Sequence, residues 1–282
     1  MTEWTTASAP ATTANLGPAF DVIALAIGLR CTVYAKTADD WSIEHLDGNE
    51  PSPGEGDAVL AAAQQAIGDR PLAMRVESKI PMGKGLGSSA AAFVAGTAAA
   101  LRAIGDSASH DHVYSVAAEL EGHDDQVGAA VFGGLVLIPA EGLPIRLPLH
   151  PSLRPVMAIP PTRLFTSKAR EGIAEDHPLD VVIRSLSRVS ALTAGLMTGD
   201  PGMLAAAHGD EIHEAPRALL SPEVDLMIDA ARGAGAFHAS RSGAGPSVVA
   251  VTSVDTADRV ASALAATGAT VINEPMETTG LV

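Results

Sequence analysis

The sequence is poor in cysteine, in aromatic residues and in positive charge, and each shortage excludes a class of protein. Its single cysteine, Cys31, rules out an intramolecular disulfide and a multi-cysteine metal site, and its apolar neighbours favour a buried thiol over a nucleophile. Only 18 Lys and Arg stand against 33 Asp and Glu, for a net charge of -15, and aromatic residues make up 3%. Because nucleic-acid binding draws on positive charge and base stacking, we expect no nucleic-acid partner.

Long apolar runs are missing as well. The run from residue 90 to 101 is rich in alanine and too short to span a bilayer, and the first residues show no basic stretch followed by an apolar one. We therefore expect a soluble, cytoplasmic protein that does not bind membranes. With 47% hydrophobic residues, the chain can bury the core of one large domain or two small ones.

The apolar patterns predict an α+β fold in two parts. Alternating or β-branched stretches predict strands, whereas alanine-rich stretches and those begun by proline predict helices. Strands are expected at 21–37, 72–79, 134–138, 154–159, 236–240, 247–251 and 270–273, and helices at 57–67, 88–104, 111–120, 178–198, 201–208, 222–232 and 256–266. Prolines crowd the region from 144 to 155, which predicts an N-terminal domain of residues 1–150 and a C-terminal domain of residues 151–282.

Glycine and serine gather between the strand expected at 72–79 and the helix expected at 88–104. Residues 80–91 read IPMGKGLGSSAA. Glycines let backbone amides approach a ligand closely, and the free N–H groups at the start of a helix bind phosphate. The spacing fits neither the common P-loop nor the dinucleotide fingerprint. The functional interpretation is a phosphate cradle, and the alternative is a glycine-rich helix start without a ligand.

Two further polar segments lie far from this loop in the sequence. Residues 10–21, PATTANLGPAFD, read as a turn whose Asn15 and Asp21 could accept bonds from an ammonium group and orient a hydroxyl. Residues 240–247, SRSGAGPS, form a glycine turn between two strands, which would support the phosphates if it packed against the loop. Each segment alone predicts only a turn, and an Asx-type turn is the alternative for the first.

Taken together and in this order, the three segments resemble the signature motifs of the GHMP kinase superfamily, and the first resembles that of the homoserine kinases in particular. The resemblance runs from about residue 10 to residue 247. It implies a two-domain α+β fold whose N-terminal half is like ribosomal protein S5 domain 2. It also implies ATP and Mg²⁺ as cofactors, and an enzyme that phosphorylates the side-chain hydroxyl of homoserine in threonine biosynthesis. Members of the family are often homodimers, so a homodimer is consistent with the resemblance.

The resemblance also implies which residues form the site. The nucleotide would be bound by Pro81, Gly83, Lys84, Gly85, Leu86, Gly87, Ser88, Ser89, Gly243 and Gly245. The amino acid would be bound by Asn15, Asp21, Asp125, Gln126, Thr166, Arg170 and Arg217. The expected catalytic groups are Lys84, which would stabilise charge on the transferring phosphoryl group, Asp21, which would orient the hydroxyl, and the Mg²⁺ ligands Ser88 and Glu119. Glu121 competes with Glu119, because residues two apart on a helix do not share a face.

Arginine distinguishes an amino-acid kinase from its relatives. Two guanidinium groups, those of Arg170 and Arg217, can hold an α-carboxylate bidentately, although surface salt bridges are the alternative for each. Ala19 stands where homoserine kinases have Gly, and Gln126 where they have Asn. A kinase for another small alcohol, such as mevalonate, shikimate or a pantoate-like compound, therefore stays open, and so does a non-catalytic nucleotide-binding protein.

The histidines show no metal-ligand spacing. We interpret them as surface or helix-cap residues: His110, His112, His123, His208 and His213.

Overall fold

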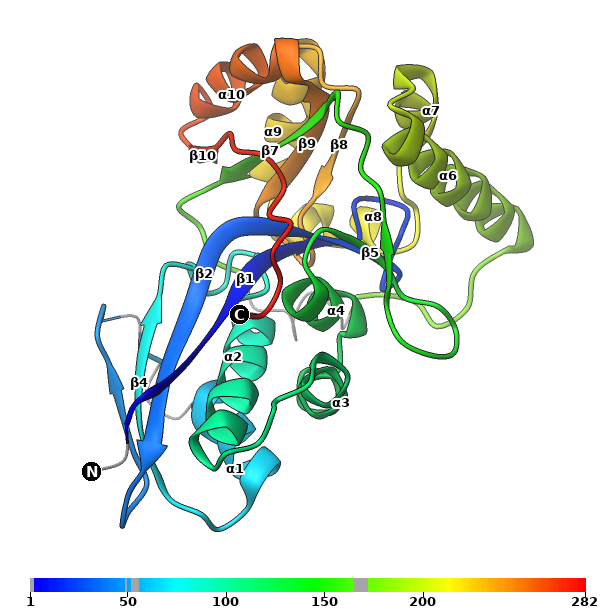
Figure 1. The fold of residues 1–282 in the computed structure, drawn as a ribbon. Helices are drawn as coiled ribbons and strands as arrows, with labels where there is room; N and C mark the ends of the chain where they lie inside the picture. The colour runs from blue at the N-terminus through cyan, green and yellow to red at the C-terminus, as the bar shows by residue number, and fades with distance from the viewer. Residues whose placement is uncertain (1–2, 49, 52–55, 165–171) are drawn as a thin grey trace.

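The computed structural model describes residues 3–48, 50–51, 56–164 and 172–282, and its strands form two sheets (Figure 1). The first sheet contains β1 Thr5–Ala14, β2 Ile23–Thr37, β3 Ser42–His45, β4 Leu72–Ser78, β5 Leu135–Leu137 and β6 Ile145–Leu147. Its order is β3-β4-β2-β5-β6, with β1 paired to β2. The second sheet has the order β10-β7-β9-β8, from β7 Leu153–Ile159, β8 His238–Arg241, β9 Val248–Ser253 and β10 Thr270–Ile272.

The helices pack on these two sheets or on one another. They are α1 Ala58–Ile67, α2 Ser88–Ala103, α3 His110–Glu121, α4 Asp124–Phe132, α6 Leu179–Thr198, α7 Pro201–Ala206, α8 Glu214–Arg217, α9 Glu223–Gly233 and α10 Ala257–Ala265. Two short 3₁₀ turns, η1 Ala218–Leu220 and η2 Val254–Thr256, complete the described elements. The predicted strands and helices are all present, with ends that agree to within about two residues. The α+β fold class is thereby confirmed.

The interpretation of residues 10–21 as a turn was wrong over its first part, which belongs to β1. This strand pairs with β2 from Thr5 opposite Ala35 to Ala14 opposite Ala24. The register shifts at Pro10, where an irregularity tolerates a residue without an N–H. Small buried residues make β1, and such residues carry little strand signal in a sequence. For the same reason, or because they are short, β3, β6, α4 and α8 were not predicted.

Helix α2 lies across β1 and β2 and fixes the position of the loop that precedes it. Its alanines are buried, and their small side chains bring the helix close to its neighbours. At Gly96 the backbone of α1 lies so near that an added Cβ would stand 2.9 Å from the carbonyl oxygen of Val59. The close packing sets the N-terminus of α2 beside the end of β4.

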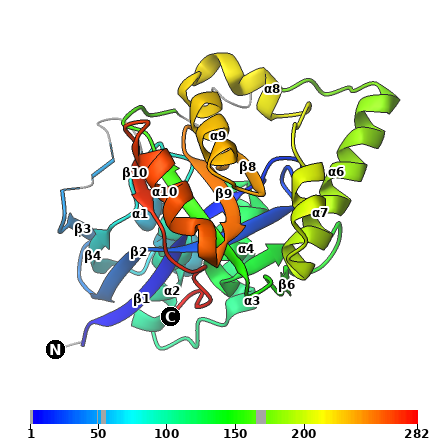
Figure 2. The same cartoon turned by 90° about the horizontal axis from the view of Figure 1, so that it is seen from above.

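Both faces of the second sheet are buried. On β7, Val156 and Ala158 face α9 and α10, whereas Leu153, Met157 and Ile159 join the main core, as the period of two in a strand requires. That core also contains residues of α6, α7 and the first sheet. A shared core of this kind holds the β8–β9 hairpin over the first sheet, as the view from above shows (Figure 2).

The segment from residue 274 to 282 returns from the second sheet to the first (Figure 1). Val282 and Ser8 exchange backbone hydrogen bonds of 2.8 and 3.0 Å, and Leu281 donates to the Val131 carbonyl at 2.9 Å. Arg30 donates to the Gly280 carbonyl at 2.7 Å. The chain therefore changes sheet between β6 and β7 but closes back on its first half, and the domain boundary near residue 150 stays a prediction.

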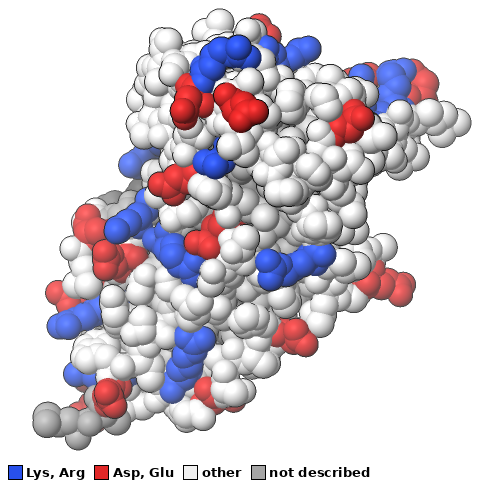
Figure 3. Space-filling model, turned by 45° about the horizontal axis from the view of Figure 1, so that its top comes forward, with Lys and Arg blue, Asp and Glu red and all other residues white. Residues whose placement is uncertain are grey.

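The surface carries both signs of charge. Over the face seen in Figure 3, acidic and basic side chains are interspersed, so neighbouring charges offset one another. Among the helices in the described part of the chain, none is long and apolar enough to cross a membrane.

Candidate active site

The three glycine-bearing segments meet where the two sheets join. The Thr12 backbone N–H donates to the Leu86 carbonyl at 3.0 Å, which ties β1 to the loop. From the β8–β9 hairpin, the Ser242 hydroxyl donates to the Gly85 carbonyl at 2.7 Å. The condition stated for the third segment, that it packs against the loop, is therefore met. Segments more than 150 residues apart in the chain are thus in contact at this loop.

The loop of residues 79–87 has a backbone that its glycines make possible. Gly83, Gly85 and Gly87 all have positive φ, at 68°, 71° and 63°. Alternating with residues of ordinary φ, they form a concavity of the kind whose N–H groups bind anions. Among the described residues, no side chain caps the start of α2, so the first N–H groups of that helix remain available to a ligand. The local geometry suits phosphate.

A cavity of about 500 Å³ opens beside this loop, a size typical of small-molecule sites. Its lining includes apolar side chains such as Val59 and Phe93, together with His45 and Asp57, whose Nε2 and Oδ2 lie 2.7 Å apart. The loop from Pro81 to Ser89 forms another part of the lining. An elongated ligand with a flat apolar end and an anionic end fits this distribution of groups.

Lys84 does not point where the sequence suggested. Its ammonium donates to the carbonyls of Pro160 and Pro161, at 2.7 Å each, and to that of Thr162. An ammonium has three N–H groups, and all are used here. Burial, followed by the charge of Arg163, lowers its pKa. The role expected for Lys84, stabilising a transferring phosphoryl group, is therefore not supported, because its donors tie the loop to the residues that follow β7.

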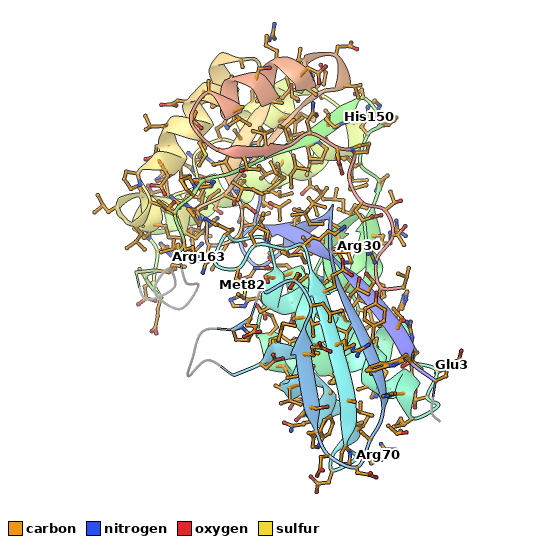
Figure 4. All side chains as sticks on the ribbon, turned by 90° about the vertical axis from the view of Figure 1, so that its left-hand side faces the viewer. Glu3, Arg30, Arg70, Met82, His150 and Arg163 are labelled. Atoms are coloured by element: carbon orange, nitrogen blue, oxygen red, sulfur yellow. The ribbon has the colours of Figure 1, made fainter. Side chains whose placement is uncertain are left out.

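The same junction can be followed in Figure 4, where Met82 and Arg163 lie near one another between the two halves of the molecule. The Leu164 N–H donates to the Gly83 carbonyl at 2.9 Å, which adds a second tie between the loop and this segment.

Of the two glutamates on α3, the structure brings Glu121 and not Glu119 to the loop. Glu121 Oε2 accepts from the Ser89 hydroxyl at 2.6 Å, and Glu121 lines the cavity together with Ser88. Glu119 is exposed and does not line it. The choice of Glu119 as the metal ligand is corrected for this reason: the helix turns its carboxylate away. The geometry places a hydroxyl and a carboxylate beside a phosphate-sized concavity.

Asn15 braces the turn that follows β1. Its Nδ2 donates to the Gly243 carbonyl at 3.1 Å, and its Oδ1 accepts from the Asp21 N–H at 3.0 Å. Asn15, Leu16 and Asp21 all have positive φ, at 73°, 45° and 55°. Both ends of the amide are thus engaged within the protein, and a direct contact of Asn15 with a substrate stays a prediction.

Asp125 is a buried carboxylate with only partial compensation for its charge. Its side chain is 1% exposed, and its Oδ1 accepts from the Gln126 N–H at 2.8 Å, while its Oδ2 has no hydrogen-bond partner among the residues that the structure describes. Burial and then the charge of Asp21 raise the pKa of Asp125 to about 7. Two carboxylates so placed favour a cation between them. Gln126 lies alongside, with Oε1 3.4 Å from the Thr12 hydroxyl.

Arg217 at the end of α8 is buried, and it reaches the turn at residues 15–21. Its guanidinium lies 5.6 Å from the ring centroid of Phe20, the neighbour of Asp21. The surface salt bridge considered for Arg217 is therefore excluded. Thr166 and Arg170, the other residues expected at the amino acid, lie outside the described residues.

Two of the histidines depart from their interpretation as surface or cap residues. His213 occupies the N-cap position of α8, but its side chain does not cap that helix: it is fully buried, and its ring bonds with the Gly17 carbonyl and with Arg217. His208 stacks on the buried His238 with ring centroids 4.9 Å apart. His123, by contrast, does stand at the N-cap of α4. The sequence offered no signal for the contact of His213 with Gly17, which lies 196 residues away, whereas Arg217 lies only four residues along the chain.

Family comparisons agree with this geometry. The family description "GHMP kinases N terminal domain" matches residues 57–134, and "GHMP kinases C terminal" matches residues 178–270. The chain belongs to the GHMP kinase family. A homoserine kinase of Thermus thermophilus is 39% identical over 250 residues, which cover 86% of this chain and 85% of that protein. Homoserine kinase of Gloeobacter violaceus is 35% identical over 277 residues, covering 92% and 91%. Within the family, the chain thus groups with the homoserine kinases.

Solved structures show the same relationship. Homoserine kinase from Cytophaga hutchinsonii superimposes with a TM-score of 0.88 at 27% identity, covering 100% of this chain and 98% of that one. Mevalonate kinase of Methanococcus jannaschii superimposes with a TM-score of 0.74 at 16% identity, covering 99% of each chain, and shares the fold.

Proposed function

We propose that this enzyme transfers the γ-phosphoryl group of ATP to the side-chain hydroxyl of L-homoserine, giving O-phospho-L-homoserine for threonine biosynthesis. One arrangement carries the choice of an amino acid: the buried carboxylate of Asp125 lies within the electrostatic reach of Asp21, and the guanidinium of Arg217 lies over Phe20, the residue before Asp21. Paired carboxylates suit an ammonium group and a guanidinium suits a carboxylate, so the arrangement is complementary to a zwitterion.

The nucleotide would lie with its base in the cavity and its phosphates along the loop from Pro81 to Ser89. Apolar side chains in the cavity lining and N–H groups of the loop suit the two ends of ATP. We propose that Mg²⁺ is held by Ser88 and Glu121, because a hydroxyl and one carboxylate are typical protein ligands for a Mg²⁺ that also binds phosphates. The ion would neutralise charge on the phosphates.

Catalysis would then rest on positioning. Asp21 would orient the acceptor hydroxyl, Asp125 would hold the ammonium group, and Arg217 the carboxylate. The loop N–H groups and the start of α2 would face the transferring phosphoryl group. Lys84 would keep the loop in shape through its carbonyl partners. We assign no general base.

Turnover of homoserine tests the proposal directly. In a coupled assay of ADP release with Mg-ATP, we expect homoserine to exceed threonine, serine, mevalonate and shikimate in kcat/KM. Arg217→Ala should raise the KM for homoserine about 100-fold and change that for ATP less than about threefold, because only the amino acid carries the carboxylate. An unchanged homoserine KM would contradict the assignment, and no turnover of any alcohol would favour a nucleotide-binding protein.

The metal site is tested by a matched pair on α3. Glu121→Gln should raise the Mg²⁺ concentration needed for half-maximal activity about 30-fold, since an amide is a weaker ligand than a carboxylate. Glu119→Gln is the control, because that side chain is exposed and lies outside the cavity. Activity is to be titrated with Mg²⁺ at saturating ATP. If Glu119→Gln had the larger effect, the assignment of Glu121 would be withdrawn.

A further inference from the structure

His213 has both ring nitrogens committed to groups of the proposed amino-acid site. Its Nε2 lies 2.7 Å from the carbonyl oxygen of Gly17, and its Nδ1 lies 2.7 Å from Nη1 of Arg217. The side chain is fully buried. A histidine at the start of α8 thus touches at once the turn after β1 and the arginine at the end of α8.

These two partners fix the tautomer of the ring. A guanidinium can only donate, so Nδ1 of His213 must accept from Arg217. A carbonyl can only accept, so Nε2 must carry the hydrogen that is donated to Gly17. The ring is therefore neutral with its proton on Nε2. Burial lowers the pKa of His213 to about 4, in agreement with the neutral form that the two hydrogen bonds require.

The backbone of His213 and a stacking contact also hold the imidazole in place. The backbone N–H of His213 donates to Asp210 Oδ2 at 2.6 Å, and the same oxygen accepts from the Glu214 N–H at 2.8 Å. On its face it stacks with Phe20, with ring centroids 4.9 Å apart and planes inclined by 16°. Little freedom remains for the imidazole, so it can act as a fixed acceptor.

Arg217 gains its orientation from this acceptor. A free arginine side chain samples many rotamers, and a binding site that fixes it beforehand lowers the entropy lost when the ligand binds. Here one nitrogen of the guanidinium bonds to His213, and the group lies over the ring of Phe20, on which His213 also stacks. The side chains of His213, Arg217 and Phe20 are thus in mutual contact, and Phe20 is the residue before Asp21.

We propose that His213 is a positioning residue that sets the distance between the guanidinium of Arg217 and the turn of residues 17–21, and thereby the spacing at which the carboxylate and ammonium groups of one amino acid are held. This inference rests on the proposed function. It adds to that function a residue that determines substrate length, because His213 contacts both the turn of residues 17–21 and Arg217.

Two substitutions separate the two contacts of the ring. In His213→Asn, the amide oxygen can replace Nδ1 as the acceptor for Arg217, but the side chain is too short to reach Gly17. In His213→Gln, the amide nitrogen can replace Nε2 as the donor to Gly17, but the acceptor for Arg217 is lost. Their difference therefore reports on the contact with Arg217.

We expect His213→Gln to raise the KM for homoserine about 30-fold, and His213→Asn to raise it less than about fivefold, with the KM for ATP little changed in both. Melting temperatures of both variants accompany the kinetics. Equal losses in the two variants, tracking only their melting temperatures, would overturn the proposal in favour of a purely structural histidine.

A second measurement does not depend on turnover. Nitrogen-15 NMR of the histidine side chains should show His213 as the neutral tautomer with hydrogen on Nε2 at pH 7, and Arg217→Ala should shift its Nδ1 resonance. A ring protonated on Nδ1, or an unmoved resonance, would overturn the positioning role. If wild-type enzyme failed to phosphorylate homoserine while the NMR result held, the proposed substrate would be wrong and the contact between His213 and Arg217 would stand.

Discussion

Asp125→Asn is expected to lower kcat/KM for homoserine about 1000-fold and, at pH 8, to make the protein more stable. The activity falls because the ammonium group loses a buried, charged partner. The stability rises because the wild-type carboxylate is buried beside Asp21 with its Oδ2 unpartnered among the described residues. If Asp125→Asn lowers activity but raises stability, the native carboxylate serves ligand binding and not folding.

The pH dependence follows from the raised pKa of Asp125. An aspartate in the unfolded chain has a pKa near 3.8, and burial raises it to about 7 in the folded protein. Below about pH 4 Asp125 is protonated in both states and makes no pH-dependent contribution. Between about pH 4 and pH 7 the folded state is destabilised progressively, and the full cost persists above pH 7. The full difference in pKa corresponds to at most about 4 kcal/mol. We expect Asp125→Asn to melt about 5 °C higher than wild type at pH 8, with a gap that narrows toward pH 4.

Thermal melts at several pH values, together with kinetics, check this result. Asp124→Asn is the matched control, because Asp124 is the preceding residue and is exposed. It should leave kcat/KM within about threefold and the melting temperature within about 2 °C. A loss of stability in Asp125→Asn at pH 8 would show that the carboxylate is compensated in the free enzyme, which would weaken the case for an ammonium group at this position.

Gly85→Ala is expected to abolish productive ATP binding, with kcat/KM for ATP reduced about 1000-fold. An added Cβ would stand 2.2 Å from the Ser242 carbonyl oxygen and within 2.9 Å of backbone atoms of Gly245. These are backbone atoms of the β8–β9 hairpin, which cannot move aside as a flexible side chain can. The loop would have to leave the hairpin, and its N–H groups would no longer converge on one point.

Gly83→Ala is the control for this substitution. Gly83 has nearly the same φ, 68° against 71°, so both alanines carry a similar backbone strain of about 1–2 kcal/mol. At Gly83, however, the nearest atom to an added Cβ is Cβ of Arg163, at an ordinary contact distance of 3.5 Å. ATP affinity measured by calorimetry and melting temperature should fall much further in Gly85→Ala. Equal losses in the two variants would mean that packing against the hairpin does not shape the phosphate site.

The sequence indicated most of the elements and the glycine-rich loop, but not β1, β3, β6, α4 or α8. Glycine alternation at residues 83–87, followed by a long alanine-rich helix, is local information, and local backbone preference largely decides such a conformation. Local patterns likewise predicted α2, which is rich in alanine, α6, which a proline precedes, and β7, whose alternate residues face the two sides of its sheet. Motif order then pointed to the family, since the three segments occur at positions that resemble those of known members.

Only the tertiary structure decided which way the polar side chains point. Lys84 turns to the carbonyls of residues 160–162, Glu121 replaces Glu119 at the loop, and His213 lies buried beneath Arg217. In each case the orientation depends on a partner tens to hundreds of residues away or on a fraction of a helical turn. A sequence pattern fixes which face of an element is apolar, but it does not specify the partner that will meet a polar group on the other side.

The elevated pKa of Asp125 has the same origin. Its sequence neighbours, another aspartate and a histidine, give no sign of burial, yet the fold buries Asp125 and brings it under the influence of the charge of Asp21, from the opposite end of the first half. Desolvation and charge proximity are properties of the assembled molecule. The sequence alone thus predicted a phosphate-binding loop, and the packing of distant segments determined which side chains surround it.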